Sequence, residues 1–377
     1  MLNFYTEFSN SPVLAQIPCV PFIPKQLYAS YEIESEDLSW TGKFSRYWKN
    51  ASKLDIRLVQ LTDADIVVLP YDWYWYRGPH WLPKSTSNSV AKAVEETNMA
   101  VYQEGLSAGR PVVLFFRGDR SHEPTPFTEA ITFREGLYVS HKGVRDYCMP
   151  AFSEDIAYQV PNTVQGQRRN SLTFREKNNK ATISFCGLAP KPKLNDYFKD
   201  YFYYLYTFLR QGYFDVSPNY GERLRHQAIK LLHKSETINT NFILRDKSVF
   251  LGNPDPIYKR QTRQEFIQNI VNSDYVLCCR GSGNYSYRVY ETLCMGRIPV
   301  IVSPDGQLPY EFHIDWKDYC LFVEETNLQS ISELICEHYD ALTPDAYQER
   351  QLACRKIWED YLSPEGFFRH LSLHIDN

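Results

Sequence analysis

The stretch that decides the fold is residues 275–302, YVLCCRGSGNYSYRVYETLCMGRIPVIV. An apolar run, Tyr275 to Cys279, predicts a buried strand, and a polar loop with two glycines follows it. Ser286 is a good N-cap for a helix that begins at the next residue, and Gly296 stops that helix. A second apolar run, Ile298 to Val302, predicts another strand. The stretch is therefore a strand–helix–strand unit of a parallel sheet.

The loop and the helix start have the chemistry of an anion site. Gly281 and Gly283 let backbone N–H groups approach a ligand, and the helix start adds free N–H groups. Arg280 and Arg288 add positive charge at the same end. Glu291, one turn further on, can accept hydrogen bonds from a ribose diol, so the unit indicates a nucleotide. On the pattern alone, a surface ion pair between Arg288 and Glu291 is an equal alternative.

The same segment resembles the signature of the exostosin-like glycosyltransferases, glycosyltransferase family 47. That signature is an apolar strand and an R-G loop, then S-x-R-x-x-E-A/T-L-x-x-G-x-I/V-P-V-I, L-P-F/Y-E and a hydrophobic-D/N-W group. The matching residues here are Arg280-Gly281, Ser286, Arg288, Glu291, Thr292-Leu293, Gly296, Pro299-Val300-Ile301, Leu308-Pro309-Tyr310-Glu311 and Ile314-Asp315-Trp316. Weaker similarities are Ala64 to Pro70 and Phe185-Cys186-Gly187.

The resemblance implies an α/β protein with a GT-B fold, in which two Rossmann-like doubly wound lobes face each other across a cleft. It implies inverting transfer from a nucleoside-diphosphate sugar, usually a UDP-sugar, to a saccharide acceptor in polysaccharide or glycan synthesis. No essential metal site is implied, and no cofactor besides the UDP-sugar co-substrate. The donor-binding residues that it implies are Gly187, Arg280, Gly281, Ser282, Ser286, Arg288 and Glu291. Among these, the two arginines would hold the diphosphate and the glutamate the ribose.

One departure from the family pattern keeps other functions open. Many members have G-R-D-H where this chain reads Gly109-Arg110-Pro111-Val112, so the Asp-His pair is missing. A non-catalytic nucleotide-sugar-binding or scaffold protein of the same fold is therefore an alternative. A different two-lobed nucleotide-sugar enzyme, such as an epimerase, is another. The donor sugar and the acceptor stay open.

An inverting transfer needs a base near the acceptor hydroxyl, which we expect in a loop after a strand of the N-terminal lobe. One such loop, Pro70 to Trp73, contains Asp72. The other, Arg117 to Glu123, contains Asp119 and His122. The alternative for each is an ordinary turn or N-cap residue.

Two aromatic stretches allow further predictions. Residues 71–81, YDWYWYRGPHW, are either a stacking platform for an acceptor sugar or core packing. The segment Tyr201 to Phe208 is predicted to be a core helix.

The length of 377 residues exceeds what one hydrophobic core of roughly 250–300 residues supports, so two lobes are expected. Residues 161–180 are the clearest drop in apolar content. We place the boundary there, with an acceptor-side lobe at 1–170 and a donor lobe with C-terminal helices at 171–377. Residues 1–50 are predicted to be irregular.

Composition excludes several classes of protein. The net charge of −4 argues against a nucleic-acid partner. Nine scattered cysteines without C-x-x-C indicate reduced thiols in a cytoplasmic protein, with no structural metal. The sequence shows neither a signal peptide nor an integral membrane segment. Peripheral membrane association and the oligomeric state stay open.

Overall fold

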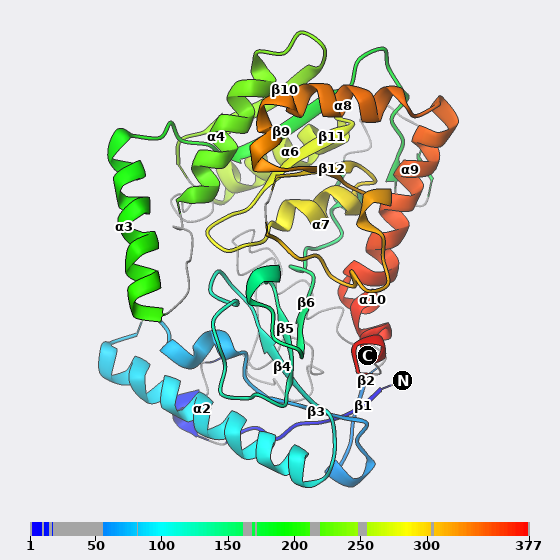
Figure 1. The fold of residues 1–377 in the computed structure, drawn as a ribbon. Helices are drawn as coiled ribbons and strands as arrows, with labels where there is room; N and C mark the ends of the chain where they lie inside the picture. Colours follow the sequence, from blue (N-terminus) through cyan, green and yellow to red (C-terminus); the bar gives the residue numbers. More distant parts are fainter. Residues whose placement is uncertain are drawn as a thin grey trace.

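The computed structural model describes residues 2–9, 11–14, 17, 56–80, 82–160, 168–169, 172–211, 219–247, 255–302 and 305–375. Two parallel sheets, each flanked by helices, form two lobes, which confirms the predicted GT-B arrangement (Figure 1). The first sheet has the order β2-β1-β3-β4-β5-β6, and the second β10-β9-β11-β12-β13. Ligands bind at the carboxyl ends of the strands in such sheets.

The strands of the first sheet are β1 (Leu2–Tyr5), β2 (Ile56–Leu58), β3 (Ile66–Val68), β4 (Val112–Phe116), β5 (Ile131–Arg134) and β6 (Asp146–Cys148). The strands of the second are β9 (Thr182–Leu188), β10 (Asn239–Arg245), β11 (Tyr275–Cys279), β12 (Ile298–Val302) and β13 (Leu321–Val323). The short strands β7 (Arg168–Arg169) and β8 (Leu172–Thr173) pair antiparallel. Strands β4, β11 and β12 are buried along their whole length, because parallel strands of a doubly wound sheet are covered on both faces.

The α-helices are α2 (Lys84–Ser107), α3 (Leu194–Gln211), α4 (Tyr220–His233), α6 (Pro256–Val271), α7 (Tyr287–Cys294), α8 (Ile331–Asp340), α9 (Pro344–Ile357) and α10 (Pro364–Arg369). Helix α2 packs on the first sheet, and α4, α6, α7 and α8 pack on the second. The predicted strand–helix–strand unit is β11-α7-β12, with β11 and β12 paired in register from Tyr275 and Ile298.

The prediction that residues 1–50 are irregular is wrong at their start. Strand β1 lies inside the first sheet, where it pairs with β2 on one side and β3 on the other. Phe4 is buried in the core. Four residues are too few to show a period, and both partner strands lie more than fifty residues away, so no local signal reveals this strand. Most of residues 18–50 lies outside the described part of the chain.

The C-terminal residues contact the first sheet. The ring of Phe367 lies 5.2 Å from that of Phe133 and 6.5 Å from that of Phe115, and Phe368 lies 6.3 Å from Phe4. Our boundary at residue 170 stays a prediction, but the end of the predicted donor lobe packs on the acceptor-side lobe. These aromatic contacts join the two lobes through their cores.

Helix α3 contradicts the prediction of a core helix at Tyr201 to Phe208. Tyr201 and Phe202 are 65% and 64% exposed, whereas Thr207 is 1% exposed. Figure 1 draws α3 along the outer edge of the molecule. A helical period predicts two faces but does not say which of them turns inward.

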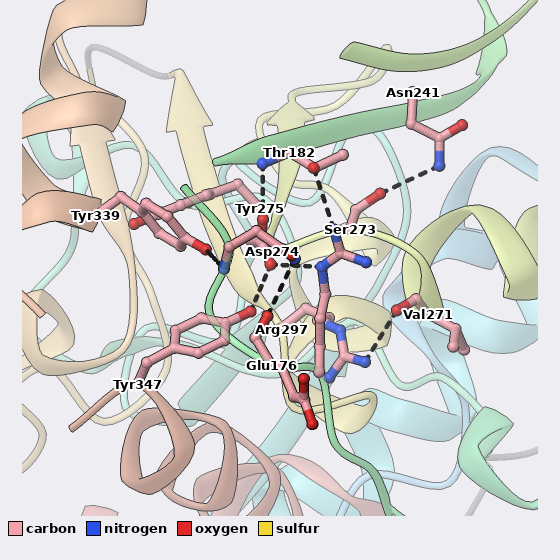
Figure 2. A network of polar contacts seen from close by, with 12 residues as sticks. Glu176, Thr182, Asn241, Val271, Ser273, Asp274, Tyr275, Arg297, Tyr339 and Tyr347 are labelled. Atoms are coloured by element: carbon pink, nitrogen blue, oxygen red, sulfur yellow. Dashed lines mark hydrogen bonds and ion pairs between the residues drawn. The ribbon is translucent and has the colours of Figure 1, made fainter. Parts of the chain in front are cut away.

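A buried polar network fixes the start of the second sheet (Figure 2). The carboxylate of Asp274, just before β11, is fully buried. Its Oδ1 accepts hydrogen bonds from Arg175 Nε and Tyr347 Oη, each at 2.6 Å, and its Oδ2 accepts one from the backbone N–H of Thr182 at 2.7 Å. The network therefore ties β9, β11 and α9 to the segment between the lobes.

Replacing Asp274 with Asn should lower the free energy of unfolding by about 3 kcal/mol, because it leaves Arg175 and a buried N–H group poorly paired. Tyr347→Phe removes only one of the three hydrogen bonds and should cost about 1 kcal/mol. Urea denaturation of both variants measures the difference. Equal losses would contradict a central role for the carboxylate.

Candidate functional site

Two arginine side chains meet at the carboxyl end of β9, and a third arginine begins the loop after β11. Arg288 of α7 donates from Nη2 to the carbonyl of Cys186 at 2.9 Å, and its guanidinium lies 4.2 Å from the centre of the Phe185 ring. Arg225 of α4 lies 5.4 Å from the centre of the same ring and donates to the carbonyl of Arg280 at 3.2 Å. Arg280 follows the last residue of β11 and is buried. The guanidinium groups of Arg225 and Arg288 thus flank the Phe185 ring, and that of Arg280 lies 5.5 Å from the centre of the Tyr138 ring.

These three arginines have no acidic partner. Within the described ranges, no carboxylate forms an ion pair with any of them, and the Nε of each is buried without a hydrogen-bond partner. Burial and the positive charge of Arg288 lower the pKa of Arg225. Uncompensated positive charge is costly to bury, so the cluster is built to receive an anion.

The backbone around the cluster leaves room for that anion. Gly187 has φ of +150°, and a Cβ added there would lie 3.0 Å from Nη2 of Arg288. A Cβ on Gly281 would meet no atom within 4 Å, so space is open beside the loop. Ser282 is exposed on the same loop. The structure therefore brings together Gly187, at the end of β9, and Arg288, at the start of α7, two of the predicted donor-binding residues.

Ser286 occupies the N-cap position of α7 with an extended backbone, as predicted. Its side chain makes no capping hydrogen bond. The first N–H groups of α7 therefore donate no hydrogen bond to this side chain.

Glu291 does not form the surface ion pair with Arg288 that was the plain alternative. It is buried, and its Oε1 lies 3.4 Å from Nη1 of Arg263, whose Nη2 lies 2.5 Å from Oε1 of Glu154. Arg263 belongs to α6, and Glu154 follows the first sheet. The carboxylate thus sits one turn below the arginine cluster in a buried ion-pair group, and its ribose role stays a prediction.

Asp119 reaches across to the other lobe. Its Oδ1 accepts hydrogen bonds from the backbone N–H of Gly283 at 3.1 Å and from Tyr285 Oη at 3.4 Å. A Cβ on Gly283 would lie 2.7 Å from the Cα of Asp119, so only glycine allows this approach. The loop after β4 is therefore in direct contact with the loop after β11.

The hydrogen bonds and the ion pair of Asp72 do not suit a general base. It is fully buried, and its Oδ2 accepts from Arg117 Nε at 2.5 Å. Its Oδ1 accepts from the backbone N–H groups of Tyr74 and Arg117. Asp72 is the N-cap of a 3-10 helix, η5 (Trp73–Arg77), which was the alternative given for it. Because both of its oxygens already accept hydrogen bonds, we do not propose Asp72 as the base.

His122 packs edge-on against Tyr138, with ring centres 5.2 Å apart. The ring of Tyr138 in turn lies 5.5 Å from the guanidinium of Arg280. His122 is thus separated from the arginine cluster by one aromatic ring. The aromatic stretch that starts at Tyr71 belongs mainly to the core, since Tyr71, Trp73 and Trp75 are buried.

Sequence reasoning missed Glu135, which follows β5. Its side chain is 2% exposed, and its Oε2 accepts from the backbone N–H of Gly118 at 2.7 Å. Burial raises the pKa of Glu135 to about 7; Asp72 and Asp119 add to the rise, and Arg117 opposes it. The signal that could have identified Glu135 is its position directly after a strand. The strand itself was not predicted, because β5 has only four residues and ends in an arginine.

Glu135 lies at the boundary between the lobes. The pKa of Tyr287, at the start of α7, is raised well above its ordinary value by burial and then by the negative charge of Glu135. Burial also raises the pKa of Tyr285, with smaller contributions from Tyr287 and then Glu135. A Cβ on the next residue, Gly136, would lie 3.3 Å from the backbone nitrogen of Asn284 and from Cδ1 of Tyr285, so the chain after Glu135 lies against the loop that leads into α7.

Arg225 was also missed. It lies in α4, where an arginine in an amphipathic helix is most simply interpreted as a surface residue. The signal against that interpretation is its position next to Leu224, on the buried side of the helix. A Cβ on Gly221 would lie 2.4 Å from the carbonyl oxygen of Arg280, so α4 can approach the loop closely only at a glycine.

The described residues contain neither a metal site nor a membrane-spanning helix. No group of three or more His, Cys, Asp or Glu residues there could hold a metal ion. No helix there is both long and apolar enough to cross a bilayer.

Comparison with known proteins agrees with this geometry. A family model described as the exostosin GT47 domain matches residues 203–337. The exostosin-1 homolog of Caenorhabditis elegans is 31% identical over 100 residues, which cover 26% of this chain and 25% of that protein. The probable glucuronoxylan glucuronosyltransferase F8H of Arabidopsis thaliana is 30% identical over 79 residues, which cover 21% of this chain and 17% of that protein. The chain thus matches a quarter or less of the length of these relatives.

Among solved structures, Anabaena Alr3699/HepE in complex with UDP and glucose aligns over 100% of both chains, with 9% sequence identity and a TM-score of 0.37. The sequence matches coincide with the segment that holds Arg225, Arg280 and Arg288. The resemblance drawn from the sequence is confirmed over residues 203–337, where this chain is similar to the exostosin GT47 domain.

Proposed function

We propose that the protein is an inverting, metal-independent glycosyltransferase. It would move a sugar from a nucleoside-diphosphate sugar to a saccharide acceptor, and the donor that we propose is a UDP-sugar. The observation that carries this proposal is the cluster of Arg225, Arg280 and Arg288, which has no acidic partner in the described chain. The setting that we propose is polysaccharide or glycan synthesis. The names of the relatives, which include glucuronosyltransferases, support it.

The arginine cluster would act on the leaving group. Breaking the bond between sugar and diphosphate leaves negative charge on the diphosphate oxygens. Guanidinium groups and the positive end of the α7 helix dipole would stabilise that charge without having to move, which is often the largest single contribution to catalysis. Gly187 would let the diphosphate lie close to Arg288.

We assign the base to Glu135 and a positioning role to Asp119. The Oδ1 of Asp119 holds the donor loop through Gly283 and Tyr285. One oxygen of Glu135 accepts a hydrogen bond from the backbone N–H of Gly118. The pKa of its carboxyl is about 7, which suits a base that works near neutral pH. In an inverting displacement it would take the proton from the acceptor hydroxyl as that oxygen attacks the anomeric carbon.

We also propose a reducing, cytoplasmic location. Eight cysteines in the described residues are free thiols, and seven of these are buried. The pKa values of Cys278 and Cys354 are raised by burial to about 12, so these thiols stay protonated and unreactive.

The experiment that tests the proposed function measures UDP release from a panel of UDP-sugars, with and without oligosaccharide acceptors, in the presence and absence of a chelator. We expect acceptor-dependent release that the chelator does not change, and a product whose anomeric configuration is opposite to that of the donor. Binding without release or hydrolysis would favour the non-catalytic alternative. Isomerised sugar without release would favour the epimerase alternative.

A further inference from the structure

Helix α3 turns its polar side to the protein and its aromatic side to solvent. Asp200 and Thr207 are 9% and 1% exposed, whereas Leu209 is 75% exposed. The large apolar and aromatic side chains that are exposed along this helix are Leu194, Tyr197, Phe198, Tyr201, Phe202, Tyr204, Leu205, Tyr206, Phe208 and Leu209. Exposed side chains of this size in one contiguous set mark a site of interaction.

The helix is held in this orientation from its inner side. Asp200 forms an ion pair with Arg223 of α4. The guanidinium of Arg223 also lies 4.7 Å from the centre of the Tyr197 ring and 5.5 Å from that of Tyr220. At the start of the helix, the Asp196 side chain accepts from the backbone N–H of Lys193 at 2.8 Å. These contacts fix the aromatic side outward.

The exposed set is too wide for a single partner helix. At about 100° per residue, its ten members cover an arc of about 200° around the helix axis. The seam of a two-helix coiled coil uses only two positions in seven, so a second helix would cover part of the arc. A planar apolar medium that meets the helix from one side covers far more of it.

The charges around the exposed set are basic. Lys191, Lys193 and Lys199 are exposed, and no acidic residue between 190 and 209 is. Asp200 is buried and pairs with Arg223, whereas Asp196 is half-buried, accepts from the backbone N–H of Lys193 and lies 3.8 Å from Nζ of Lys199. Lysines that flank an apolar face can extend their ammonium groups to phosphate headgroups, and tyrosines favour the same boundary region.

We propose that α3 is an interfacial anchor that lies in the plane of an anionic lipid bilayer, with its aromatic side in the boundary between headgroups and acyl chains. Such a helix has a strong separation of its two faces and low overall hydrophobicity, as α3 has. The anchor holds the protein at a membrane surface without spanning it. The two lobes then stand beside the surface, with α3 between them and the lipid.

The test is co-sedimentation of the full chain with vesicles of phosphatidylcholine alone and of phosphatidylcholine mixed with phosphatidylglycerol. We expect wild-type protein to bind the mixed vesicles, and Phe202→Glu combined with Leu209→Glu to lower the bound fraction at least about tenfold. The control is Val144→Glu, because Val144 is 97% exposed and lies in the other lobe, and it should bind like wild type. Thermal unfolding of all variants checks that each is folded.

A second measurement separates the lipid from another protein surface. Light scattering in lipid-free buffer should show a monomer for wild type and variants. A wild-type dimer that the double variant dissociates would overturn the proposal in favour of a second copy on α3. Absent binding, or equal binding by wild type and double variant, would also overturn it. Lys191→Gln with Lys193→Gln should weaken binding to the anionic vesicles only.

Discussion

Replacing Arg288 with Gln is expected to lower kcat/KM for the nucleotide-sugar donor by about 10²–10³-fold. The removed guanidinium is one of three positive groups that have no acidic partner in the described structure, and it sits where charge develops on the leaving diphosphate. The effect should fall on the donor, so KM for the acceptor should change little. Steady-state kinetics with varied donor and fixed acceptor measures it.

The stability of the ligand-free Arg288→Gln variant should stay close to that of wild type. The substitution removes one hydrogen bond, to Cys186, but also removes the repulsion between Arg288 and Arg225. The matched control is Arg145→Gln, because Arg145 is exposed beside Glu129, away from the site. Donor kinetics within threefold of wild type would contradict the assignment, whereas unfolding of the variant would identify a structural role.

Replacing Glu135 with Gln is expected to lower kcat by about 10²–10⁴-fold while donor affinity is kept. The base works in its ionised form, and the pKa of Glu135 is about 7. The rate of the wild-type enzyme should therefore rise with pH and level off above about 7. In the variant, that rise should be absent. Kinetics between pH 5 and 9, with donor affinity measured separately, gives both results.

The same substitution has an expected signature in stability. The pKa of Glu135 is raised from 4.5, the ordinary value of an exposed glutamate, to about 7, so the folded protein holds its proton more tightly than the unfolded chain. Its contribution to stability is present below about pH 4.5 and is lost as the pH rises through 7. Glu135→Gln should remove that part of the decline. A rate profile that still rises through pH 7 in the variant would contradict the base role, and Asp119→Asn would then be the variant to examine.

The donor half of the fold could be predicted from the sequence because its signals are local. The run Tyr275 to Cys279 is apolar throughout and ends at a loop with two glycines, and both Arg280 and Arg288 follow it within a dozen residues. Helix, strand and anion site therefore appear in one continuous segment. The structure places them as expected, as β11, α7 and the loop between them.

The parts that the sequence did not reveal depend on distant partners. Arg134 is buried in β5 because Asp146 and the carbonyls of Ser121 and Glu123 bind it, and none of these is near it in the chain. Because a buried arginine is unusual in a strand, the sequence did not predict β5, nor that the carboxyl of Glu135 follows a strand end. Arg225 is placed in the site by the packing of the whole of α4, and α3 turns its aromatic side outward because Asp200 on its other side pairs with Arg223.

The most direct test of the central claim is a thermal-shift comparison of UDP, UMP and uridine on the wild-type protein and on Arg225→Gln, Arg280→Gln and Arg288→Gln. If the arginine cluster holds a diphosphate, UDP should raise the melting temperature most, UMP less and uridine hardly at all, and each variant should lose most of the UDP effect. Equal shifts with uridine and UDP, or no shift with any nucleoside diphosphate, would contradict a donor site at this cluster.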